Sequence, residues 1–250
     1  MKIRPIVSNI NSPTTKISWF LSSILKPLLD EVPAHLQSSD VLVNKLKNLN
    51  SATVKEFPYP FSLDVVALYT SIPIADAVEN VKMIMEASRF KYKSLTTDDI
   101  GELLLAVFTN TYLQFNNKIF LQVKGLAMGS NVSPILAILF MDTLERRVLN
   151  VSRSISTYCR YVDDIFMLTT NKDSATNIHT QMNSLHPAIE FEIEHPTTNN
   201  TLSLLDIEVK INVQDGSICM EHFKKKAKKD VFLNFNTALP ASTKKKHCHK

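Results

Sequence analysis

Apolar side chains recur every three to four residues along several stretches of the chain, a spacing typical of helices that bury one face. The first such helix begins at Ser12-Pro13-Thr14. Its predicted apolar face consists of Ile17, Phe20, Leu21, Ile24 and Leu28. A second helix follows Ser39-Asp40, with the inward side chains Val41, Val43, Leu46 and Leu49. Further helices are predicted over residues 76–88, over 98–111 with Thr97 as its cap, from Ser133-Pro134 through Leu144, and over 173–185.

Between these helices lie short runs that predict strands. Residues 61–68 form a nearly continuous apolar run, and a further strand is predicted at residues 189–193. Three hairpins are predicted: residues 112–123 turning at Asn116-Asn117, residues 157–170 with Asp163-Asp164 at or near the turn, and residues 202–223 turning at Asp215-Gly216. Helices and strands do not alternate regularly, which favours an α+β fold.

Composition narrows the class of protein. The chain has 250 residues, of which 44% are apolar and 21% charged, as in ordinary globular proteins. No apolar stretch approaches the roughly 20 residues that span a bilayer, and the N-terminus lacks a signal-peptide pattern, so no membrane partner is expected. Three widely spaced cysteines indicate reduced thiols in an intracellular protein.

The net charge of +4 is distributed unevenly. Residues 223–250 contain nine lysines and one aspartate, so the preceding 222 residues carry a net negative charge. A mildly acidic body with a basic extension suits a protein that binds nucleic acid. A solvated tail or a nuclear-import signal explains the lysines equally well.

Three carboxylates stand out because their surroundings are apolar. Asp64 is the only charged residue between Phe57 and Ala75, and Asp163 and Asp164 are the only ones between Tyr161 and Asn171. A carboxylate withdrawn from water costs several kcal/mol unless a cation compensates it. The pattern therefore predicts a pair of hard divalent ions, as used for phosphoryl transfer. Neighbouring strand residues face opposite ways, so Asp163 is assigned as the partner of Asp64 and Asp164 as a secondary ligand.

Two of the four glycines, Gly125 and Gly129, lie just before the helix that begins at Ser133-Pro134. Glycines in this position allow a ligand to approach the backbone closely, and the helix N-terminus favours an anion. A glycine-containing turn with a purely architectural role is the alternative.

In order along the chain, these segments resemble the motifs of reverse transcriptases, most closely those of Penelope-like retroelements, which are relatives of telomerase. Arg4-Pro5-Ile6-Val7-Ser8 resembles the family's fingers motif, and Asp64-Val65 with Leu68-Tyr69-Thr70-Ser71-Ile72-Pro73 its motif A. Ala127-Met128-Gly129-Ser130 with Ser133-Pro134 resembles motif B, and Arg160-Tyr161-Val162-Asp163-Asp164 motif C. Leu204 to Val209 resembles the primer grip, and Phe223-Lys224 through Phe232-Leu233 the start of the thumb.

The resemblance implies an RNA-directed DNA polymerase that uses two Mg²⁺ ions, with Mn²⁺ as an alternative. Asp64 and Asp163 would hold the metals together with the Val65 carbonyl, and Asp164 would support them. Tyr69 would block a ribose 2′-hydroxyl. The remaining residues with implied roles are Arg4, Met128 and Gly129 for the incoming nucleotide, and Tyr161, Lys224, Lys225, Lys226, Lys228 and Lys229 for nucleic acid. The implied partners are an RNA template, a DNA primer and dNTPs, and the implied location is the nucleus.

The implied architecture is a right-hand polymerase palm, a ferredoxin-like antiparallel sheet with helices, joined to partial fingers and the start of a thumb. The expected division is fingers at 1–56 and 74–128, palm at 57–73 and 129–221, and thumb from 222 to 250. Because the resemblance begins within the fingers and ends in the thumb, a truncated copy is expected, without the GIY-YIG endonuclease of many family members.

Three alternatives remain: a catalytically inactive relic that only binds nucleic acid, a host telomerase-like enzyme, and a generic two-metal nuclease. A nuclease would have the carboxylates without the Tyr69 and motif B signals.

Overall fold

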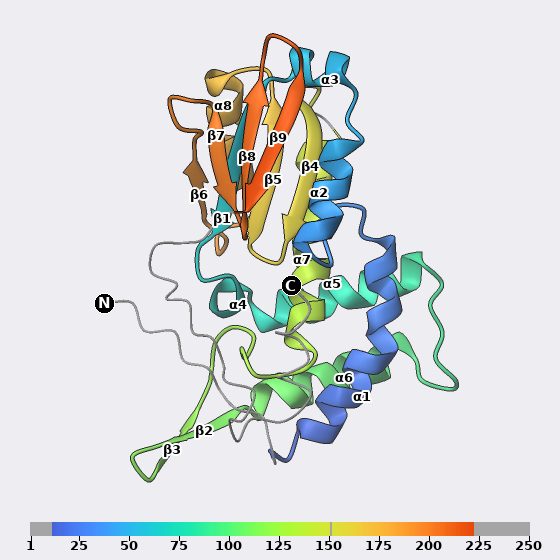
Figure 1. The fold of residues 1–250 in the computed structure, drawn as a ribbon. Helices are drawn as coiled ribbons and strands as arrows, with labels where there is room; N and C mark the ends of the chain where they lie inside the picture. The colour runs from blue at the N-terminus through green and yellow to red at the C-terminus, as the bar shows by residue number, and fades with distance from the viewer. Residues whose placement is uncertain (1–11, 151, 223–250) are drawn as a thin grey trace, which may run out of the picture.

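The structure is a computed structural model that describes residues 12–150 and 152–222. The two larger sheets lie in the upper part, and several helices and a two-stranded hairpin lie in the lower part (Figure 1). The elements are α1 (Thr15–Leu25), η1 (Lys26–Glu31), α2 (Ser39–Lys47), α3 (Ser51–Glu56), β1 (Tyr59–Val65), α4 (Leu68–Ser71), α5 (Ile74–Ala87), α6 (Thr97–Thr109), β2 (Tyr112–Phe115), β3 (Lys118–Leu121), α7 (Ser133–Leu149), β4 (Ile155–Tyr161), β5 (Asp164–Thr169), α8 (Lys172–Asn183), β6 (Phe191–Glu194), β7 (Thr201–Leu204), β8 (Ile207–Asn212) and β9 (Ser217–His222). The predicted α+β class is confirmed.

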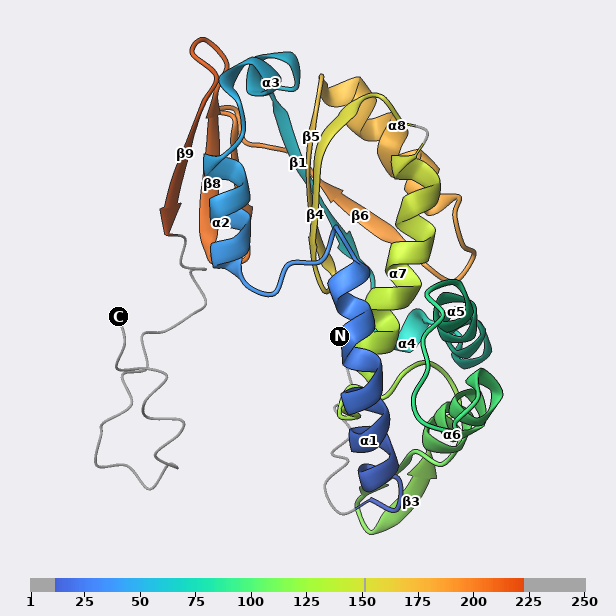
Figure 2. The same cartoon turned by 90° about the vertical axis from the view of Figure 1, so that its right-hand side faces the viewer.

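A four-stranded sheet in the order β4-β5-β1-β6 is the centre of the upper part, and its neighbouring strands are antiparallel. Helices α7 and α8 cover one face, whereas the three-stranded sheet β7-β8-β9 and α2 lie on the other side (Figure 2). The alternation of side chains along β1 and β5 separates the two faces. Phe61, Leu63, Val65, Ile165 and Met167 join the main core with α7 and α8. Phe166 and Leu168 join a second core with β7, β8 and α2.

The lower helices pack around the first half of α7, with α5 against α7 and α1 against α6. Pro134, in the first turn of α7, begins the helix without the loss of an intrahelical hydrogen bond. Helix α6 begins with a capping box in which the Thr96 side chain binds the Asp99 N–H and Asp99 binds the Thr96 N–H. The cap is therefore Thr96, one residue before the predicted Thr97, because Asp99 makes the reciprocal bond only with Thr96.

Several predicted boundaries change. The strand predicted over residues 61–68 ends at Val65, because Ala67 adopts a left-handed conformation with φ +52° and α4 begins at Leu68. The hairpin predicted over 202–223 contains three strands within the described residues, because Leu205, at φ +55°, makes an additional turn before β8. Helix α3 was not predicted. Val41, predicted to point inward, is 37% exposed, and Leu42 is buried in its place.

The remaining predicted elements are present. Asn116 and Asn117 both have positive φ in the β2–β3 turn, which is the requirement of a tight type I′ hairpin. This hairpin projects from the lower part and exposes apolar side chains, including Phe115 and Ile119. Residues 39–56, expected in the fingers, contribute Leu42, Leu46 and Val54 to the second core beside β7–β9. In the described ranges, no helix combines the length and hydropathy of a membrane span.

Candidate active site

The predicted acidic residues lie at one end of the four-stranded sheet. The strand registers align Tyr161 with Asp164, Asp164 with Asp64, and Asp64 with Glu192, which makes one row across β4, β5, β1 and β6. Directly opposed residues of antiparallel strands extend their side chains from the same face. On β1 and β5 this is the face away from α7 and α8, since Leu63, Val65 and Ile165 occupy the helix side.

Asp163 lies next to this row, in the turn between β4 and β5. Val162, the first residue of the turn, has φ +58°, a rare and strained conformation for a β-branched side chain. The Val65 N–H donates a hydrogen bond to the Asp163 carbonyl at 3.2 Å, which ties the turn to the end of β1. The predicted turn is therefore present, with Asp163 in it and Asp164 at the first position of β5. The residue directly opposite Asp64 is Asp164, with Asp163 one position beyond it.

The chemistry of this end of the sheet suits a hard divalent cation. Asp64, Asp163 and Asp164 are all half-buried, and carboxylate oxygens are the preferred ligands of Mg²⁺. Like charges directly opposite one another destabilise a strand pair, so a cation here would relieve a cost that the register imposes. Within residues 12–150 and 152–222, however, no three Asp, Glu, His or Cys side chains are arranged as a group that could hold a metal ion. The strand register therefore places the backbones of these residues together, without a metal-binding group among the described side chains.

Tyr69 lies on the short helix α4 that follows β1. Burial raises the pKa of its phenol, and the nearby Asp163 carboxylate raises it further. Tyr69 lies four residues after Val65, whose N–H bonds to the Asp163 carbonyl, so α4 adjoins the turn. The phenol stays protonated at neutral pH, so it can donate a hydrogen bond.

The loop that precedes α7 is fixed against α4. A Cβ on Gly125, at φ +74°, would lie 2.5 Å from the Thr70 Cα, so only glycine fits. The next residue, Leu126, donates its N–H to the Tyr69 carbonyl at 2.6 Å. At Gly125 the chain's own Thr70 backbone, and not a ligand, makes the close approach. Gly125 therefore has the architectural role that was the alternative to ligand binding.

The half-buried residues Met128 and Gly129 follow in the same loop. The Ser133 hydroxyl donates to the Ala127 carbonyl at 2.7 Å, and the Ser130 and Ser18 hydroxyls are 2.8 Å apart. These bonds hold the loop on both sides of Met128 and Gly129. Arg4, Lys224, Lys225, Lys226, Lys228 and Lys229 lie outside the described residues.

Two features of the site were not predicted. Glu192 lies opposite Asp64 in this row. The alternation of apolar and acidic residues in Phe191-Glu192-Ile193-Glu194 is the sequence feature that indicates a strand with its glutamates on one face. A buried ion pair between Arg160 and Glu145 lies behind the turn, on the helix side of the sheet. Glu145 is one of four charged residues on α7, with Asp142, Arg146 and Arg147, so the helical pattern did not single it out.

Residues 1–196 match the family described as reverse transcriptase (RNA-dependent DNA polymerase). This chain belongs to the reverse transcriptase family. The matched range contains the whole acidic row, Tyr69 and the loop before α7.

Relatives of this reverse transcriptase include telomerase. The telomerase reverse transcriptase of Oxytricha trifallax is 27% identical over 147 residues, which are 54% of this chain and 13% of that protein. Apo telomerase from Candida tropicalis, truncated from its C-terminal domain, superposes with a TM-score of 0.60 at 15% identity, covering 85% of this chain and 46% of that one. A BmCPV RNA-dependent RNA polymerase at elongation state superposes with a TM-score of 0.50 at 11% identity, covering 85% and 21%.

These similarities identify the fold as that of polymerase palm and fingers, with mixed helices and antiparallel sheets. This reverse transcriptase chain spans less than half the length of the three relatives.

Proposed function

We propose that the chain is the RNA-directed DNA polymerase domain of a Penelope-like retroelement and extends a DNA primer on an RNA template with dNTPs. The observation that carries the proposal is the register of Asp64 with Asp164, with Asp163 in the adjoining turn. In a member of the reverse transcriptase family, carboxylates at this end of the sheet have the chemistry that nucleotidyl transfer needs.

In the proposed site, Asp64 and Asp163 would hold two metal ions with the Val65 carbonyl, and Asp164 would support them. Asp64 and Asp164 lie directly opposite one another and Asp163 is the adjoining residue, so the proposal requires these three carboxylates to turn toward a common point. Two bound Mg²⁺ ions, or Mn²⁺ in their place, would activate the primer 3′-hydroxyl and offset the charge of the triphosphate and of the leaving pyrophosphate.

Tyr69 is proposed to select deoxyribonucleotides. Its helix is fixed by the Leu126–Tyr69 hydrogen bond, and its phenol lies within the influence of Asp163. A fixed ring at this position would collide with a ribose 2′-hydroxyl. Tyr69→Ala is expected to raise the incorporation of ribonucleotides relative to deoxyribonucleotides, measured by primer extension with each set of triphosphates. Unchanged discrimination would remove Tyr69 from this role.

The remaining assignments are proposals that follow from this one. Met128 and Gly129 line the floor of the nucleotide site, Arg4 contacts the incoming nucleotide, and Tyr161 and the lysines from Lys224 to Lys229 contact nucleic acid. Residues 57–73 and 129–221 form the palm, and the enzyme acts in the nucleus. The Penelope-like subtype rests on the ordered resemblance of the motifs from the fingers to the start of the thumb, and a GIY-YIG reading frame in the flanking genomic sequence would test it.

Primer extension on an RNA template with Mg²⁺ tests the proposal. Asp163→Asn is expected to lower the rate by about a thousandfold or more, because it removes a metal ligand. Asp173→Asn, which changes an exposed carboxylate in the first turn of α8, is the matched control and should extend at the wild-type rate. Equal extension by wild type and Asp163→Asn would refute the assigned role.

The alternative of a non-catalytic nucleic-acid-binding protein is favoured by the nine lysines of residues 223–250. It predicts binding to an RNA–DNA hybrid that weakens steeply with salt, because counterion release drives such binding, together with no extension by the wild type. Turnover by the wild type therefore separates the two functions.

A further inference from the structure

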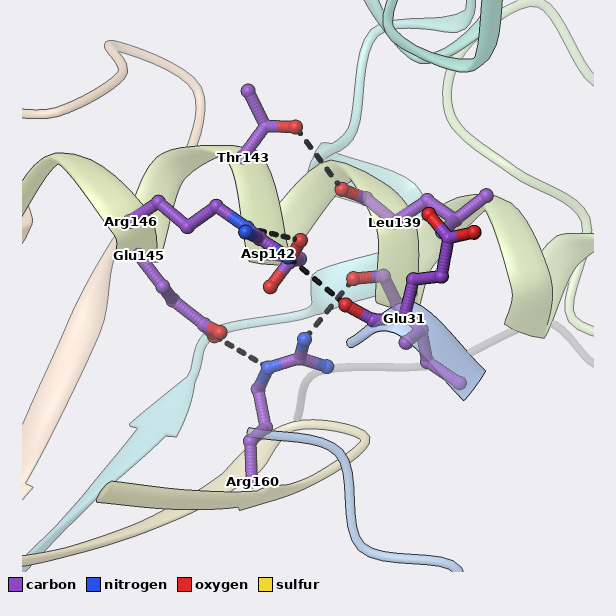
Figure 3. A network of polar contacts seen from close by, with 8 residues as sticks. Glu31, Leu139, Asp142, Thr143, Glu145, Arg146 and Arg160 are labelled. Carbon is purple, nitrogen blue, oxygen red and sulfur yellow. Dashed lines mark hydrogen bonds and ion pairs between the residues drawn. The ribbon is translucent and has the colours of Figure 1, made fainter. Parts of the chain in front are cut away.

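Arg160 is the largest side chain that the described core buries completely. It lies on β4, three residues before Asp163, and points toward α7 (Figure 3). Its guanidinium forms an ion pair with Glu145 of α7, and neither side chain is exposed to solvent. Burial raises the pKa of the Glu145 carboxyl, and the Arg160 charge opposes that rise.

The remaining donors of Arg160 bind two backbone carbonyls. One nitrogen donates to the Ile138 carbonyl of α7 at 3.0 Å. Another donates to the Val162 carbonyl at 3.3 Å, in the turn that carries Asp163. Planar guanidinium groups present several donors in a fixed fork, so one side chain here connects α7 to the turn.

The backbone of Arg160 is held as well. Its N–H donates to the Ala34 carbonyl at 2.7 Å, and its carbonyl accepts from the Leu36 N–H at 2.8 Å. The segment after η1 therefore fixes β4 from the other side. Because both its backbone and its guanidinium group are held by hydrogen bonds, Arg160 can hold the turn in one place.

Stability alone does not explain this pair. Desolvation of two charges offsets most of their attraction, and apolar replacements of buried ion pairs are often as stable or more stable. The turn, by contrast, needs a restraint. Val162 is held at φ +58°, where a β-branched residue is strained, and such conformations persist only when the surroundings over-determine them.

We propose that Arg160, oriented by Glu145, is a positioning residue that holds the Val162–Asp163 turn against α7 and so fixes the Asp163 carboxylate relative to Asp64. Helix α7 begins at the end of the loop that carries Met128 and Gly129. The pair therefore fixes the carboxylate turn to the helix that follows the proposed nucleotide floor. The catalytic consequence rests on the proposed function, and the structural role does not.

The test is the double substitution Glu145→Met with Arg160→Met, which removes the pair without leaving an unpaired charge. The Val65 N–H, which bonds to the Asp163 carbonyl, reports on the turn by hydrogen–deuterium exchange. We expect its exchange to accelerate about tenfold or more, since local opening sets the rate. The Val66 N–H bonds to Glu190 at 2.9 Å instead and should exchange at the wild-type rate. We further expect kcat for primer extension to fall about a hundredfold with a much smaller change in KM.

A second pair on the same helix provides the matched control. Arg146 pairs with Asp142 at 2.7 Å and donates to the Glu31 carbonyl at 3.0 Å, so this pair connects α7 to η1 and not to the turn (Figure 3). Asp142→Met with Arg146→Met should leave both the Val65 exchange and kcat at wild-type values.

Wild-type Val65 exchange in a folded Glu145→Met, Arg160→Met protein would overturn the proposal. Should that protein not fold, Arg160→Lys, which keeps the charge but loses the fork, is measured against the same expectation. Failure of both to fold would assign the pair to stability and also overturn it. If the double variant exchanges Val65 faster but the wild-type protein does not extend primers, the positioning role is supported and the proposed function is rejected.

Discussion

Strands β1 and β5 present two faces built from alternate residues of the same segments, and the faces serve different purposes. Toward α7 and α8 they present Phe61, Leu63, Val65, Ile165 and Met167, all nearly inaccessible to solvent. Toward β7–β9 they present apolar side chains only where the second sheet covers them. At the strand ends this face carries half-buried carboxylates in register. Neighbouring residues of one strand should therefore differ in whether substitution affects stability or the proposed activity.

The largest expected effect is on activity. Asp64→Asn should lower primer extension by about a thousandfold or more, because it removes one of the carboxylates that would hold the proposed metals. The free energy of unfolding without metal should change by less than about 1 kcal/mol, since the amide keeps the shape and reduces like-charge repulsion with Asp164. Rate measurements beside urea unfolding check both parts. A parallel loss of stability and activity would break the contrast between the faces.

The neighbouring residue should behave in the opposite way. Leu63→Ala removes a fully buried side chain from the helix-covered face and should cost about 2–5 kcal/mol of unfolding free energy. Extension per folded molecule should stay within a few-fold of wild type, measured below the unfolding midpoint. A selective loss of activity in a stable Leu63→Ala protein would argue that this face also contributes to the chemistry.

A smaller effect is expected where the loop before α7 meets α4. Gly125→Ala forces a Cβ against the Thr70 backbone at φ +74° and should cost about 2–4 kcal/mol, at the same time displacing the helix of Tyr69. Gly101→Ala, within helix α6, is the control, because its Cβ would lie 3.1 Å from the flexible Lys82 side chain of α5 and in ordinary contact with Val78 at 3.6 Å. That change should be neutral or stabilise the protein by up to about 1 kcal/mol. Equal destabilisation by the two substitutions would show that the contact between Gly125 and Thr70 does not require glycine.

The smallest effect is expected away from both faces. Ile119, on the projecting β2–β3 hairpin, is 74% exposed. Ile119→Lys should therefore change the free energy of unfolding by no more than about 0.5 kcal/mol, as measured by thermal or urea unfolding. A larger loss would mean that the hairpin packs against another part of the chain in solution.

Local patterns in the sequence predicted most elements and the residues that define the site. Helical periodicity located α1, α5, α6 and α7, and paired asparagines located the β2–β3 turn. Two of the errors, the end of β1 and the additional turn before β8, occurred where Ala67 and Leu205 adopt positive φ, a conformation that their residue types disfavour. Propensity describes average behaviour, so such positions are not predictable from local sequence.

What the sequence determined by itself was which residues carry charge in apolar surroundings and the order of their motifs, since both depend only on neighbouring residues. The tertiary structure alone decided that Asp64 lies opposite Asp164, a hundred residues away, with Glu192 beside it and Arg160 paired to Glu145 behind the turn. The register of distant strands depends on how both faces pack at once, and a shift by one residue would exchange the faces. No local pattern contains that information.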